Sequence, residues 1–181
     1  MDTKLGIGLA TGMFFHAPAG TALPSYPTDT LDSAWVHIGD VTDAGITLST
    51  SKSTTNLKNW ANQIKRVLMT DHSETIQSPV MDTTEESLKA VMGSGNVTVT
   101  AAATGHGKKV AVNLSADDLP PQEAFLWLMK DGDDMMMIGC SYGQVTSVAD
   151  VNFAPTAAIN WTPTITAEGD GFHLIMEEAA E

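Results

Sequence analysis

The second half of the chain is built from short segments in which apolar and polar residues alternate, separated by turns rich in glycine and aspartate. Val97 and Val99 alternate with threonines, a turn follows at residues 105–107, and residues 110–114 alternate back. Strict alternation places apolar side chains on one face of a strand, and a short turn between two such runs predicts an antiparallel hairpin. Residues 125–130 with 135–140, and residues 159–167 with 172–176, predict two further hairpins.

The sequence of the first half of the chain predicts fewer but longer secondary-structure elements. Residues 10–15 and 34–41 read as strands, and a turn at residues 43–45 leads into a strand over residues 46–51. Residues 63–80 are extended throughout, which would span about 60 Å without a break. A bulge or break near Asp71 and His72 is therefore expected.

One helix is signalled, over about residues 83–92. Asp82 is placed to cap it, Glu85 follows three residues later, and Gly93 ends it. Leu88 and Val91 fall on one helical face and would pack on the sheet. These elements predict one mainly β domain over residues 1–181, a β-sandwich or partly closed barrel with one short flanking helix.

Residues 1–33 are expected to form an N-terminal arm and an irregular, proline-containing loop. The first 20 residues also share features with a secretion signal, since Ala17-Pro18-Ala19 resembles a cleavage site. Glycines interrupt the apolar run, and Asp2 nearly cancels Lys4. We therefore favour a glycine-rich arm.

Composition excludes several classes of function. Nine basic residues stand against 22 acidic ones, giving a net charge of −13. A protein that binds nucleic acid needs a basic surface, so specific DNA binding is not expected. No apolar run approaches the roughly 20 residues that span a bilayer, so no membrane partner is expected.

The search for catalytic and ligand-binding motifs gives no candidate. Gly132-Asp133-Asp134 falls in a hairpin turn, and residues 105–109 lack the spacing of a phosphate-binding loop. The five histidines never fall at helical metal-ligand spacing. The single cysteine, Cys140, lies among apolar residues and is expected to be buried and inert. The chain is predicted to be no enzyme, with no metal and no cofactor.

Residues 49–57 carry almost only hydroxyls and amides, and the run ends near a tryptophan. We expect residues 49–62 to form a polar loop that is loosely ordered alone and becomes ordered against another copy of the protein. Leu57 and Trp60 would anchor it. The alternative is a mobile surface loop with Trp60 packed on its own core. The expected contact residues are Ser49, Ser51, Lys52, Thr54, Thr55, Asn56, Leu57 and Trp60.

The order of these parts resembles the major tail proteins of long-tailed bacteriophages, the tail tube family. The resemblance rests on ATGMFFHAPAGTALP, IGDVTDAGITLSTSKSTTNLKNW, QIKRVLMTDHSETIQSPVMD, the helix TTEESLKAVMG and NVTVT. It is strongest over residues 35–100, and FHLIMEE fits the family's last strands. Met135, Met136 and Met137 match no part of the family's pattern.

The resemblance implies a structural virion protein. Six subunits would close into a ring, and rings would stack into the tail tube through which genomic DNA passes without specific binding. The implied partners are further copies of the chain, the tape measure protein, the tail terminator and baseplate or distal tail proteins. Assembly would take place in the host cytoplasm.

Three other functions stay open on the sequence alone. One is a tube subunit of a contractile injection or type VI secretion system. Another is a secreted or surface β-sandwich binding module whose four tryptophans stack on sugars. The last is a small hydrolase.

Overall fold

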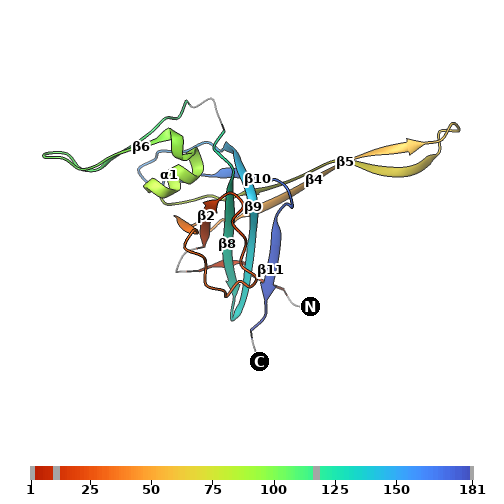
Figure 1. The fold of residues 1–181 in the computed structure, drawn as a ribbon, viewed down its shortest axis with the longest axis horizontal. Coiled ribbons are helices and arrows are strands. Elements are labelled where there is room, and N and C mark those ends of the chain that lie inside the picture. Colours follow the sequence, from red (N-terminus) through yellow and green to blue (C-terminus); the bar gives the residue numbers. More distant parts are fainter. Residues whose placement is uncertain (1–2, 10–12, 116–118, 180–181) are drawn as a thin grey trace.

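The computed structural model describes residues 3–9, 13–115 and 119–179. In that part the fold is mainly β with one α-helix, and its sheets do not close into a barrel, consistent with a β-sandwich-like fold (Figure 1). The strands are β1 (Ile7–Gly8), β2 (Phe14–Pro18), β3 (Val36–Gly39), β4 (Thr47–Lys58), β5 (Ile64–Gln77), β6 (Val97–Thr100), β7 (Lys109–Val112), β8 (Glu123–Asp131), β9 (Asp134–Val148), β10 (Pro163–Ala167) and β11 (His173–Glu177).

Nine of these strands form one antiparallel sheet in the order β3-β2-β8-β9-β10-β5-β4. β1 adds to β8 and β11 adds to β9, while β6 and β7 form a separate pair. The hairpins predicted for β6–β7 and β8–β9 are confirmed. The predicted strand over residues 10–15 begins at Phe14 instead, and residues 10–12 lie outside the described residues.

The predicted third hairpin, between β10 and β11, is wrong. β10 pairs with residues 143–148 of β9, and β11 pairs with residues 135–139 of the same strand. The two strands therefore lie end to end along one edge of β9. Alternation correctly identified both strands but carries no information about which strand each one pairs with.

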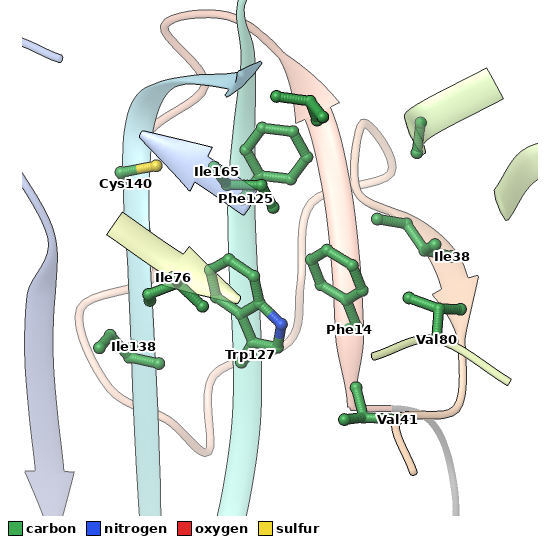
Figure 2. Close-up of a cluster of buried hydrophobic side chains, with 12 residues drawn as sticks. Phe14, Ile38, Val41, Ile76, Val80, Phe125, Trp127, Ile138, Cys140 and Ile165 are labelled. Atoms are coloured by element: carbon green, nitrogen blue, oxygen red, sulfur yellow. The ribbon is translucent and has the colours of Figure 1, made fainter. Parts of the chain in front are cut away.

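The central strand β8 is buried on both faces, so it separates two apolar clusters. Phe125 and Trp127 point into the main core with Phe14 and Ile138 (Figure 2). Leu126 points to the opposite side, where the connection between β2 and β3 covers it. The Trp127 ring stacks on Phe14 with centroids 4.6 Å apart.

Helix α1 (Glu85–Met92) closes one end of the fold. Its N-cap is Thr84, which exchanges hydrogen bonds with Ser87 in a capping box, so the predicted caps Asp82 and Glu85 are wrong by a few residues. Asp82 instead accepts a hydrogen bond from the Asp40 amide at 2.8 Å. Gly93 ends the helix at a φ of 85°, a backbone conformation that favours glycine.

Cys140 is fully buried in the main core. Burial raises the pKa of its thiol from the ordinary value of 9.0 to about 12. The reactive thiolate is therefore nearly absent at neutral pH.

We expect the native protein to resist iodoacetamide at neutral pH and the urea-unfolded protein to be alkylated at one site, measured by intact mass. Rapid alkylation of the folded chain would contradict this burial.

Candidate assembly site

The most prominent feature of the molecule is a two-stranded ribbon that extends far from the rest of the fold (Figure 1). We call β4, β5 and the turn between them the hairpin arm (residues 47–77), and the remaining described residues the body. The predicted loop over residues 49–62 is thus wrong in conformation, because residues 47–58 form one continuous strand paired with β5. Every residue of β4 is exposed.

The arm contains two irregularities in its pairing. Ser53 pairs with Asp71 but Thr54 pairs with Met69, so Thr70 is an extra residue in β5. A second shift between Leu57 and Lys58 leaves another residue of β5 unpaired. The first shift confirms the irregularity predicted near Asp71. Such bulges increase the local twist of a ribbon.

The tip of the arm is a tight three-residue loop. The amide of Asn62 donates to the Asn59 carbonyl at 2.9 Å, and Asn62 has a φ of 60°. Asparagine tolerates this left-handed conformation, which completes a type I turn in hairpins of this length. The Asn59 side chain also accepts from the Gln63 amide at 2.8 Å. These bonds fix the tip and leave Trp60 completely exposed.

The predicted contact residues lie along one strand and at the tip, and they do not converge on a pocket. Alternation places Lys52, Thr54 and Asn56 on one face of the ribbon and Ser49, Ser51, Thr55 and Leu57 on the other. Trp60 does not pack on its own core, so that alternative is wrong.

Sequence reasoning missed the β5 half of this surface. Ile64, Val67 and Met69 are 56%, 58% and 63% exposed, and they pair with Lys58, Asn56 and Thr54 of β4. The sequence predicted this segment only as extended backbone, without assigning it a contact surface. Contiguous exposed apolar residues of this kind mark a surface that binds a partner.

The arm is also basic within an acidic chain. Four of the nine Lys and Arg residues lie on it, and residues 51–70 contain no aspartate or glutamate. None of the four forms an ion pair with another described residue. They are Lys52, Lys58, Lys65 and Arg66.

A second hairpin, β6–β7, projects from the opposite side of the body (Figure 1). Val97 and the half-buried Val99 pack beneath α1. Glu85 of the helix pairs with Lys108 and Lys89, and these hydrogen bonds hold the pKa of the Glu85 carboxyl below its ordinary value. This hairpin is therefore attached to the body by both packing and charge.

The described residues include no group of three or more His, Cys, Asp or Glu side chains arranged to hold a metal ion. Within the same residues, no helix has the length and apolar character needed to cross a membrane.

A family model described as phage tail tube protein matches residues 6–176, which includes the body and the whole arm. The chain belongs to the phage tail tube proteins. The resemblance seen in the sequence is confirmed, and with it a structural role in the virion tail. No curated protein matches the chain. Membership of this family implies self-assembly into a tube and association with other tail proteins.

Proposed function

We propose that this tail tube protein closes into rings of six subunits, and that the rings stack into the conduit through which the genome enters the host. The observation that supports this best is the hairpin arm. It has exposed apolar residues on β4, β5 and the tip, and nothing in the described body covers them. An isolated two-stranded ribbon is marginally stable in water, so the arm gains its stability from a neighbouring copy.

In this proposal the arm reaches the adjacent ring. Its hydroxyl and amide groups form hydrogen bonds when the neighbouring surface excludes water, and Leu57 and Trp60 supply apolar contact. The contact set from the sequence is retained: Ser49, Ser51, Lys52, Thr54, Thr55, Asn56, Leu57 and Trp60. Ile64, Val67 and Met69 join it because they are exposed on the paired strand.

The ends of the large sheet support ring closure. β3 and β4 are its two terminal strands, so each has an unpaired edge in the described chain. Val36 on β3 is exposed, and no lysine or proline protects that strand. Exposed edges invite pairing with another chain, and a closed ring satisfies them all.

The net charge of −13 suits a conduit for DNA. Acidic subunits repeated around a channel repel the phosphate backbone, so the genome passes without binding to the wall. The remaining partners in this proposal are the tape measure protein, the tail terminator and baseplate or distal tail proteins. Assembly takes place in the host cytoplasm, and no catalysis is required.

The tryptophans argue against the sugar-binding alternative. Trp35, Trp127 and Trp161 are buried. Only Trp60 is free to stack on a ligand, and one aromatic ring at the end of a ribbon does not make a carbohydrate groove.

Negative-stain microscopy of the purified protein tests the proposal directly. We expect rings or tubes, with a mass by light scattering that rises with protein concentration. The control is the same protein in a urea concentration just below unfolding, where assemblies should dissociate to folded subunits. A strictly monomeric protein at high concentration, with no tubes on standing or with added salt, would contradict the proposal.

A further inference from the structure

A groove lies at the root of the hairpin arm, between the first strand and the turn that precedes β4. It has a volume of about 510 Å³, and Gly45, two residues before β4 begins, lies on its wall. Its apolar lining includes two methionines, whose thioethers make favourable contacts with aromatic rings. The main lining residues are Leu9, Met13, Val41, Met81, Asp40 and Asp43.

The groove carries negative charge that is not neutralised within the described chain. Asp40 and Asp43 form no ion pair with any described residue. The Asp82 carboxylate lies close by, since it accepts a hydrogen bond from the Asp40 amide. Three carboxylates beside an apolar lining favour a partner that is both cationic and apolar.

The tip of the arm has that chemistry. Trp60 is completely exposed, and Lys58, Lys65 and Arg66 flank it without any acidic neighbour between residues 51 and 70. The Asn59–Gln63 hydrogen bonds fix the turn that presents Trp60. An exposed aromatic side chain with basic residues nearby is a typical anchor of a protein interface.

A subunit cannot fill its own groove with its own tip. The tip and the groove lie at opposite ends of β4, and eleven steps of an extended strand separate them by about 36 Å. A tip seated in the groove of a second copy leaves one free groove and one free tip, so the contact repeats head to tail. Contacts of this kind build open stacks.

We propose that Trp60 of one copy docks in the root groove of a copy in the next ring, with Lys58 and Lys65 facing Asp40 and Asp43. This deepens the proposed function and rests on it. The charges fix the docked position, and the apolar lining takes up the indole ring.

Another acidic hollow provides the control. It has a volume of about 290 Å³ and is lined by Asp29, Asp32 and Trp35. Its carboxylates already accept hydrogen bonds from the Tyr26 and Ala34 amides within the subunit. They are therefore less available to a partner than those of the root groove.

Cross-linking tests which surface the tip meets. Cys140 is buried and unreactive, so introduced cysteines are the accessible thiols. We expect Ala61→Cys with Thr42→Cys to give a ladder of covalent oligomers when assembled protein is treated with a short bismaleimide. The control, Ala61→Cys with Thr30→Cys in the other hollow, should give no ladder. A ladder from the control pair and none from the groove pair would overturn the docking.

Charge reversal separates docking from folding. Lys58→Glu with Lys65→Glu, or Asp40→Lys with Asp43→Lys, should each reduce tube yield at least tenfold while the subunit stays folded. A chain carrying all four changes should recover assembly, and so should a mixture of the two double variants. If the wild-type protein and both double variants all assembled equally well, the docking would be overturned and the proposed function would stand. A wild-type chain that never assembles would overturn the proposed function.

Discussion

Shortening the hairpin arm is expected to abolish tube assembly and leave the body folded. The register allows a clean change: residues 51–73 are replaced by Asn-Gly, so that the paired Thr50 and Glu74 flank a two-residue turn. The removed residues are almost entirely exposed and include Leu57, Trp60 and Met69. Assembly is measured by negative-stain microscopy, and folding by circular dichroism with urea.

The second hairpin offers a matched control for this experiment. Replacing residues 102–107 with Asn-Gly preserves the pairing of Thr100 with Lys109 and keeps Lys108, which pairs with Glu85. No large apolar side chain is exposed between residues 97 and 112, so this hairpin lacks the arm's apolar surface. The control should still form tubes. Tubes of normal length from the arm-shortened variant would show that the arm does not stack the rings.

The central strands of the body were predictable because they have buried faces. In β8 and β9 the apolar residues that mark the strands fill the two cores, and their turn is short and rich in aspartate and glycine. The helix was predictable for the same reason, since Leu88 and Val91 face the body. Its start was misplaced because Asp82 and Thr84 are both competent caps and the sequence alone does not choose between them.

The β4 half of the arm escaped prediction because it has no buried face. In residues 49–57 nothing alternates, and serine and threonine are as common in loops as on exposed strands. Threonine does favour extended backbone, and that signal was available. Trp60, expected to anchor this segment, is fully exposed at its end.

The groove at the arm root was not predictable at all. It joins Leu9 and Met13 to Asp40 and Met81, and only the folded chain brings these segments together. Nothing in the local sequence of Asp40 or Asp43 distinguishes them from solvent-exposed turn residues. A groove formed by segments that are distant in the sequence can be recognised only in the folded structure.

The two tryptophans at positions 127 and 60 should respond to alanine substitution in opposite ways. Trp127 is fully buried, stacks on Phe14 and donates to the Ser78 hydroxyl at 3.0 Å. Trp127→Ala removes this packing and leaves a cavity, which should lower the free energy of unfolding by about 3–5 kcal/mol. That is a large share of the roughly 5–15 kcal/mol that stabilises a typical domain.

Trp127→Phe separates packing from hydrogen bonding, because it keeps a ring but leaves the buried Ser78 hydroxyl without its donor. We expect a smaller loss, on the order of 1–3 kcal/mol.

Trp60→Ala is the surface counterpart of Trp127→Ala. Trp60 contacts no core residue, so the free energy of unfolding should change by less than about 0.5 kcal/mol. Tube yield should nevertheless fall, because the exposed ring is available only to another copy. Urea denaturation of the dissociated subunit and microscopy of the assembled protein measure the two effects separately. If Trp60→Ala instead destabilised the isolated subunit as much as Trp127→Ala, the indole would be packing within its own chain. The indole of Trp60 would then no longer support a role of the arm in assembly.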